Sequence, residues 1–252
     1  MRTVNICKHL VYDHWISDMT NCSVYRLVTD DGFVEDISHL EPAEYHSQLP
    51  FESKPIFIYT KIPVATGSSK LVKCLERLGF HLVDTNIVFR KPILRNPKCF
   101  YNNCQMRFAE QEDREQVAEL ARNNFIYSRF HLDDEIPSST ANNIKAEWAS
   151  NFFAGRRGDK LVVALIDNVV VGFLLLLESL EDLIIDLIAV DKNQHRKGIA
   201  SDMITYVEHH LNEFFRIQVG TQLANVPSIR LYEKMGFRVF ASNYVFHYHK
   251  SY

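Results

Sequence analysis

Hydrophobic and polar positions in the second half of the chain follow helical and strand periods in turn. Two segments, Glu112–Asn123 and Ser139–Phe153, place apolar side chains at the three- and four-residue spacing of one helix face. Two β-rich runs, Leu161–Ile166 and Val169–Leu177, are separated by the pair Asp167-Asn168, which is typical of a tight hairpin turn. The pattern predicts two amphipathic helices followed by a β-hairpin.

Strands and helices are expected to alternate over the rest of this half. They are a strand over Leu183–Val190, a helix from about Gly198 to Phe214, a strand over Arg216–Thr221, a short helix over Pro227–Met235 closed by Gly236, and two strands over Phe237–Phe240 and Tyr244–His249. This order predicts an α/β fold with a mixed central sheet flanked by helices.

The first half contains a segment similar to the end of the chain. Glu76–Arg90 and Glu233–His247 share six of fifteen positions, namely Glu, Gly, Phe, Asn, Val and Phe. Each copy follows an apolar strand, Ile56–Tyr59 or Arg216–Thr221, and a short helix. The pattern predicts a repeated strand–helix–strand–strand unit. The alternative is coincidence between two β-rich tails.

A domain boundary is expected in Lys91–Cys104, which combines two prolines and three asparagines with little apolar periodicity. It divides the chain into residues 1–98, a smaller α/β domain, and residues 104–252.

Composition and charge argue against some classes of binding partner. The 252 residues carry 28 Lys+Arg and 31 Asp+Glu without a block of like charge, which disfavours nucleic acid and anionic membrane surfaces. The longest apolar run, Val169–Leu177, is about half of the ~20 residues needed to span a bilayer. Met1–Met19 has no signal- or transit-peptide pattern, and the five cysteines include no CxxC pair. We therefore expect a cytoplasmic protein with a small-molecule substrate and no nucleic-acid or membrane partner, and a homodimer is left open.

The strongest chemical pattern lies in Ile184–Ile204. A buried strand runs into a polar loop, Gly198 permits close backbone approach, and a helix then begins. Unpaired backbone N–H groups at a helix start form a site for a pyrophosphate, and Arg196 and Lys197 add positive charge. The alternative is an ordinary helix start with solvated basic residues.

This region resembles the GNAT superfamily of acetyl-CoA-dependent N-acetyltransferases. His195-Arg196-Lys197-Gly198-Ile199-Ala200 matches the segment that holds the CoA pyrophosphate, although His195 stands where Gln or Arg is usual. About 27 residues after Gly198, a second segment with Asn225, Ser228, Tyr232 and Gly236-Phe237 resembles the family's other signature. The resemblance implies the GNAT fold and acetyl-CoA as co-substrate. The residues it implies for CoA binding are Ile188, Ala189, Val190, His195, Arg196, Lys197, Gly198, Ile199, Ala200, Asn225 and Ser228.

A narrower resemblance is to the dTDP-fucosamine acetyltransferases. It rests on Ser128-Arg129-Phe130-His131, Trp148, Arg157-Gly158-Asp159, and Val219-Gly220-Thr221-Gln222 with Asn225. It implies a truncated GNAT-like N-terminal domain and a nucleotide-linked amino sugar as substrate. Two alternatives stay open, namely another amine such as a protein terminus, polyamine or drug, and a non-catalytic CoA-binding module.

Acetyl transfer to an amine requires protonation of the departing thiolate and removal of a proton from the ammonium. By resemblance Tyr232 is the general acid, and the alternative is a tyrosine packed on the sheet. Asp186 could receive the ammonium proton through water, and it could equally hydrogen-bond a neighbour.

Substrate contacts are expected from Phe125–Pro137. Its residues Tyr127, Arg129, Phe130 and His131 could stack on a base or sugar and bind a diphosphate. The alternative is packing of the aromatic rings and a surface arginine. For Trp148 the helical spacing favours a core position.

His247 and His249 share one face of a strand, yet the sequence suggests no third ligand, so we expect no metal. In the alignment of the two copies of the repeat, Ser68 corresponds to Asn225 and Leu75 corresponds to Tyr232. No glycine-containing loop like that of Ile184–Ala200 precedes Ser68 and Leu75. We therefore expect one CoA per chain, held by residues after about Gln105.

Overall fold

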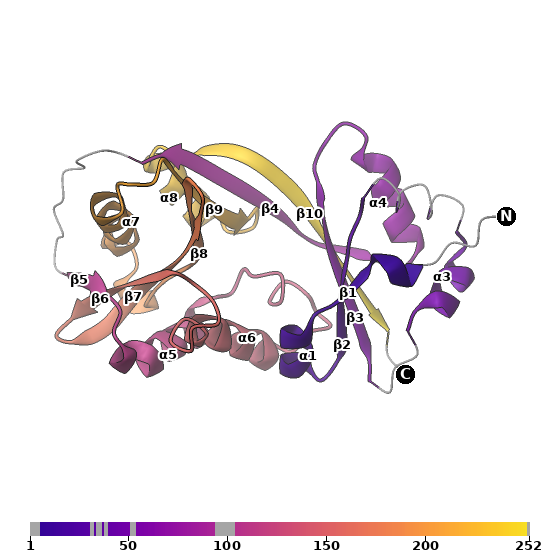
Figure 1. Ribbon diagram of the computed structural model, residues 1–252, viewed down its shortest axis with the longest axis horizontal. Helices are drawn as coiled ribbons and strands as arrows, with labels where there is room; N and C mark the ends of the chain where they lie inside the picture. The colour runs from indigo at the N-terminus through magenta and orange to yellow at the C-terminus, as the bar shows by residue number, and fades with distance from the viewer. Residues whose placement is uncertain are drawn as a thin grey trace. The chain divides into compact units, whose positions relative to one another are not determined.

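The computed structural model describes residues 6–30, 33, 37, 40–50, 54–93 and 104–250 (Figure 1). By its internal contacts the chain forms two compact units. Unit 1 comprises Met1–Asn86, Leu132–Glu135 and Ala241–Tyr252, and unit 2 comprises Ile87–His131 and Ile136–Phe240. The expected division into residues 1–98 and 104–252 stays a prediction, and most of the expected boundary, residues 94–103, lies outside the described residues.

Unit 2 is built on a mixed sheet. Its elements are β5 (Gln105–Phe108), η2 (Gln111–Asp113), α5 (Arg114–Asn124), α6 (Ser138–Ser150), β6 (Lys160–Ile166), β7 (Val169–Ser179), β8 (Asp182–Val190), η3 (Lys192–Gln194), α7 (Ile199–His210), β9 (Arg216–Gln222) and α8 (Val226–Lys234). The strand order is β9-β8-β7-β6-β5, in which β8 and β9 are parallel and the other pairs antiparallel. The expected mixed α/β architecture is confirmed.

Alternating side chains give this sheet two apolar faces, because successive residues of a strand point to opposite sides. On one face Val162, Leu174 and Leu176 pack in a cluster with Met203 of α7. On the other face Val163, Phe173 and Leu175 pack in a cluster with Val117 and Leu120 of α5. Figure 1 accordingly shows α7 on one side of the sheet and α5 and α6 on the other. Both faces are therefore covered by helices.

The expected hairpin between β6 and β7 is present. Asp167 and Asn168 both adopt positive φ, 50° and 63°, as a two-residue turn of this kind requires. The helix predicted to reach Phe214 ends at His210 instead, where Leu211 leaves helical geometry and its side chain is buried. The order of elements also predicts a strand before the two helices, and β5 is that strand.

Unit 1 has a second sheet region with its own core. Its elements are η1 (Ile6–His9), β1 (Leu10–Tyr12), α1 (His14–Thr20), β2 (Ser23–Leu27), α3 (Pro42–Gln48), β3 (Ile56–Pro63), α4 (Ser68–Arg77), the first part of β4 (His81–Pro92) and most of β10 (Arg238–Lys250). The strand order is β1-β2-β3-β10-β4. Ile58 of β3, Leu75 of α4, and Phe246 and Tyr248 of β10 belong to one buried cluster.

The internal repeat is visible in the hydrogen bonds that end α4 and α8. Leu78, Gly79 and Phe80 donate their backbone N–H groups to Cys74, Glu76 and Leu75. The equivalent Met235, Gly236 and Phe237 donate to Leu231, Glu233 and Tyr232. Gly79 and Gly236 have φ of 91° and 84°, which favours glycine after a helix end.

Each copy is a strand, a helix and one long strand, so the expectation of two strands after the helix is wrong in both. In place of strands over Phe237–Phe240 and Tyr244–His249, β10 is continuous. The residues read as a turn stay extended, and Asn243 pairs with Pro63 of β3.

Candidate active site

Strands β8 and β9 separate part-way along their length. Their parallel pairing runs from Asp182–Arg216 to Ile185–Val219 and ends there, while β8 stays paired with β7 as far as Val190. The register between β7 and β8 shifts at the same place, so that Asp186 lies opposite no residue of β7. A bulge bends a strand and strengthens its twist, which explains why β8 turns away from β9 here. Beyond Asp186, the backbone of β8 is no longer paired with β9.

The polar loop after β8 positions the start of α7. Gly198 is the N-cap residue with φ of 87°, and the preceding Arg196 also has positive φ. His195 contacts the Val190 carbonyl oxygen through Nε2 at 2.9 Å, and Lys197 donates to the Gln194 side chain at 2.7 Å. These contacts hold the loop against the end of β8.

The backbone at Gly198 fits a phosphate. A Cβ built on Gly198 would meet nothing nearer than Asp202 Oδ2 at 4.0 Å, so the space above it is open. Among the described residues, no side chain caps α7, and the N–H groups of a helix's first turn have no partner within the helix. Ile199 is buried, whereas residues 195–198 are exposed. The site therefore offers uncapped donors, a positive helix end and two cationic side chains.

The second predicted segment forms the start of α8. Asn225 caps this helix by accepting from the Ser228 N–H at 3.3 Å, and its own Nδ2 donates to Thr221 at 3.2 Å. Tyr232 is buried among Phe89 and Phe237. Burial raises the pKa of the Tyr232 phenol, and a hydrogen bond with Ser228 lowers it by less. The phenol is therefore protonated at neutral pH, as a general acid must be.

Asp186 holds two neighbouring side chains. Its carboxylate accepts from Arg157 Nε at 2.7 Å and from the Arg157 terminal nitrogen at 2.6 Å, and Trp148 Nε1 donates to it at 2.8 Å. The Arg157 guanidinium also lies 4.6 Å from the centre of the Trp148 ring. Asp186 therefore hydrogen-bonds neighbouring side chains, which was one of its two expected roles. Its other expected role, as a base that receives the ammonium proton, stays a prediction.

Arg157 is the functional candidate to which sequence reasoning gave no role. It lies 29 residues before Asp186, a separation that no local pattern reveals. The resemblance to the dTDP-fucosamine acetyltransferases already included it, and that was the available signal.

Side chains of the predicted substrate loop contact one another and helix α6. His131 contacts Ser128 Oγ through Nδ1 at 2.6 Å and Asn142 through Nε2 at 2.9 Å. Burial lowers the pKa of His131. The Arg129 guanidinium lies 4.6 Å from the centre of the Phe130 ring, and Phe130 is buried, as the packing alternative expected. Tyr127 is half-buried, and substrate binding by these four residues stays a prediction.

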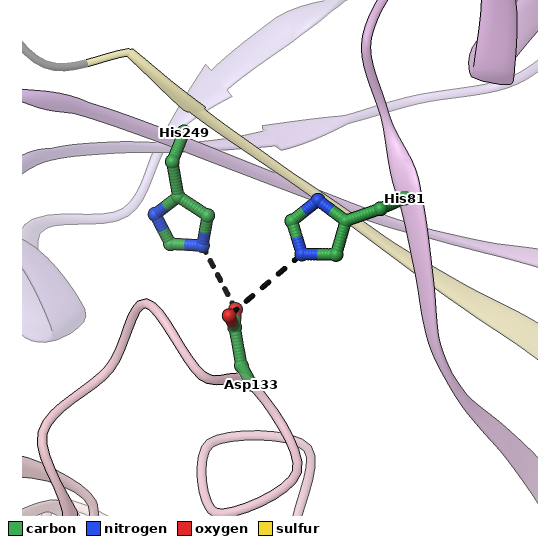
Figure 2. Close-up of side chains that lie close together, drawn as sticks. All are labelled: His81, Asp133 and His249. Atoms are coloured by element: carbon green, nitrogen blue, oxygen red, sulfur yellow. Dashed lines mark hydrogen bonds and ion pairs between the residues drawn. The ribbon is translucent and has the colours of Figure 1, made fainter.

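In unit 1 the sequence suggests no third ligand beside His247 and His249, and the structure places Asp133 against both. Asp133 Oδ2 is hydrogen-bonded to both imidazoles, and His81 lies on the other side of the same carboxylate (Figure 2). The contacts of Asp133 with His247 and His249 join residues more than a hundred positions apart, so the sequence gave no sign of them.

Comparison with known proteins gives the fold and a family match. Residues 115–237 match the acetyltransferase (GNAT) family. The structure has the fold of a conserved protein of unknown function from Staphylococcus epidermidis, with a TM-score of 0.60 over 90% of this chain and 84% of that one at 14% identity. The fold is therefore the GNAT fold, and the family match lies within residues 115–237.

Two further similarities are more particular. A tandem GNAT protein from the clavulanic acid biosynthesis pathway matches with a TM-score of 0.58 at 10% identity, over 90% of this chain and 75% of that one. In sequence, the chain is 36% identical over 160 residues to the spore coat polysaccharide biosynthesis protein SpsD of Bacillus subtilis. That alignment covers 61% of this chain and 55% of SpsD, so the chain matches about half of its curated relative.

The part of the chain that the structure describes includes no helix long and apolar enough to cross a membrane.

Proposed function

We propose that the protein is an acetyl-CoA-dependent N-acetyltransferase that acetylates the amine of a nucleotide-linked amino sugar. The acetyl-CoA-dependent activity is supported by the separation of β8 from β9, which lies beside the start of α7. Gly198 is the N-cap residue of α7, and no side chain of the described residues caps this helix. The sugar is supported by the similarity to SpsD, whose name places it in polysaccharide biosynthesis, and by the resemblance to the dTDP-fucosamine acetyltransferases.

Acetyl-CoA, when bound, supplies the thioester from which the acetyl group is transferred. The backbone N–H groups of Gly198, Ile199 and Ala200 hold its pyrophosphate, with Arg196 and Lys197 providing positive charge. His195 contributes by fixing the loop to Val190. Backbone groups of Ile188, Ala189 and Val190, on the unpaired side of β8, bind the rest of the co-substrate and polarise the reacting carbonyl.

The reaction forms a C–N bond and breaks a C–S bond, so the amine loses one proton and the thiolate gains one. Tyr232 donates that proton, with Ser228 orienting its hydroxyl group and Asn225 fixing the first turn of α8. Asp186 receives the ammonium proton through water, and Tyr127, Arg129, Phe130 and His131 bind the sugar nucleotide. The protein acts in the cytoplasm.

A screen of acceptors tests the proposal. The full chain is incubated with acetyl-CoA and dTDP- or UDP-linked amino sugars, and with spermidine and a peptide amine as competing classes. Products are read by mass spectrometry, since the chain's own cysteines react with thiol reagents. We expect acetylated product with at least one sugar nucleotide and little with the other amines.

Faster turnover of spermidine or the peptide would assign a different acceptor. Saturable CoA binding without turnover of any amine would make the protein a CoA-binding module.

A further inference from the structure

Four polar side chains meet on one face of the unit 1 sheet. His247 and His249 are two residues apart on β10, so they share a face, while Phe246 and Tyr248 point into the core on the other. His81 begins the neighbouring strand β4, and Asp133 belongs to residues 132–135, which are part of unit 1. Figure 2 shows His81 and His249 pointing at the Asp133 carboxylate from two strands.

The distances suit a shared cation. His249 Nε2 lies 2.8 Å from Asp133 Oδ2, and His81 Nε2 lies 3.7 Å from Asp133 Oδ1. One ligand atom from each of the three residues lies within 4.8 Å of the others. In a tetrahedral zinc site the metal–ligand distances are about 2.0–2.2 Å, so small side-chain movements bring these atoms into range.

The surroundings hold the ligands in place. His247 is fully buried, and its Nδ1 is hydrogen-bonded to Asp133 Oδ2. The Phe57 ring stacks on His249 at 4.7 Å between centroids and an angle of 4°, and it meets His247 edge-on. The Glu135 N–H donates to Asp133 Oδ1 at 3.1 Å. Such outer contacts orient metal ligands, and their loss typically weakens binding about 10- to 100-fold.

We propose that His81, Asp133 and His249 bind one divalent transition-metal cation, for which Zn²⁺ is the best match, and that His247 positions the Asp133 carboxylate. Two imidazole nitrogens and one carboxylate are a donor set for Zn²⁺ and its neighbours, whereas Mg²⁺ and Ca²⁺ prefer oxygen ligands alone. The His81 side chain is 47% exposed, which gives the ion a path from solvent and leaves a fourth position for water. The site fastens residues 132–135 to strands β4 and β10.

Charge supports the same site. Burial raises the pKa of the Asp133 carboxyl, but hydrogen bonds from His247 and His249 outweigh this and hold the pKa well below its ordinary value. Asp133 is therefore ionised. The carboxylate can therefore serve as an anionic ligand to a cation.

Calorimetric titration with Zn²⁺ tests the proposal on the full chain, without an affinity tag and after dialysis against a chelator. We expect one Zn²⁺ per chain, and at least a tenfold weaker affinity in His81→Ala and in His249→Ala. His14→Ala is the matched control, because His14 is exposed on α1 of the same unit, and it should bind as the unchanged protein does.

Thermal unfolding supplies a second readout. Zn²⁺ is expected to raise the Tm of the unchanged protein and of His14→Ala, and not that of His81→Ala, whose exposed side chain can be removed without disturbing the fold. Absence of saturable binding, or equal affinity in His81→Ala, His249→Ala and His14→Ala, would overturn the proposal.

Discussion

The Tyr232 hydroxyl group lies in the core of unit 2, with 2% of the residue exposed. Such a position fits a packed helix tyrosine, and it also fits an acid that must stay protonated until a thiolate forms beside it. The two interpretations differ in what loss of the oxygen does to turnover.

We predict that Tyr232→Phe folds, binds CoA and loses turnover by about 10²- to 10⁴-fold, the usual contribution of a positioned acid. Steady-state kinetics on the best acceptor measure this. Tyr206→Phe, a second buried helix tyrosine of unit 2, is the control and should retain its activity. Near-normal turnover of Tyr232→Phe would remove the phenol from the mechanism.

Asp84 on β4 makes stability depend on pH. Its side chain is buried, its Oδ2 has no hydrogen-bond partner among the described residues, and burial raises its pKa to about 6, against lowering by the Thr85 backbone and Lys61. Since the unfolded pKa is about 3.9, the folded state binds more protons between about pH 4 and pH 6. The free energy of unfolding therefore falls as pH rises through this window.

We predict that Asp84→Asn raises the free energy of unfolding by on the order of 2 to 3 kcal/mol at about pH 7.5 and by little at about pH 4. Urea unfolding at the two pH values measures the difference. Asp18→Asn, an exposed carboxylate on α1, is the control. A gain of equal size at both pH values would contradict this explanation.

At the scale of elements, the start of α7 carries the co-substrate site. We predict that Gly198→Glu abolishes CoA binding in calorimetry, because the new carboxylate repels the pyrophosphate and the side chain occupies its space. Gly155→Glu is matched to it, since Gly155 also has positive φ and open space around its Cβ position, and it should bind CoA normally. Unchanged affinity in Gly198→Glu would show that the phosphate site is elsewhere.

Elements whose apolar residues recur at a regular spacing could be predicted from the sequence. Elements whose extent depends on pairing with a distant strand could not. Helices α5 and α6 and the β6–β7 hairpin follow from apolar spacing and turn residues. The break expected within β10 does not exist, because pairing with β3 keeps small and polar residues extended.

The same distinction holds within the candidate sites. The glycine and basic residues before α7 are adjacent in sequence, so their arrangement could be read directly. The Arg157–Asp186 and Asp133–His249 contacts join distant segments, and only the folded chain brings them together.

At the scale of the whole molecule, the two copies of the repeat carry different residues at the positions that we assign to catalysis. Leu75 takes the place of Tyr232, and Ser68 takes that of Asn225, where its hydroxyl group bonds to Pro63 and Ala65. The first copy keeps the strand, helix and long strand, together with the same hydrogen bonds at the helix end. It carries neither the acid nor the cap that we assign to the second.

Calorimetric titration of the full chain with acetyl-CoA tests the account most directly, because stoichiometry and location of binding follow from the same proposal. We predict saturation at one acetyl-CoA per chain, abolished by Gly198→Glu and retained in Gly67→Glu, which lies before α4, the counterpart of α8 in the first copy. Saturation at two per chain, no binding at all, or loss of binding in Gly67→Glu alone would contradict it.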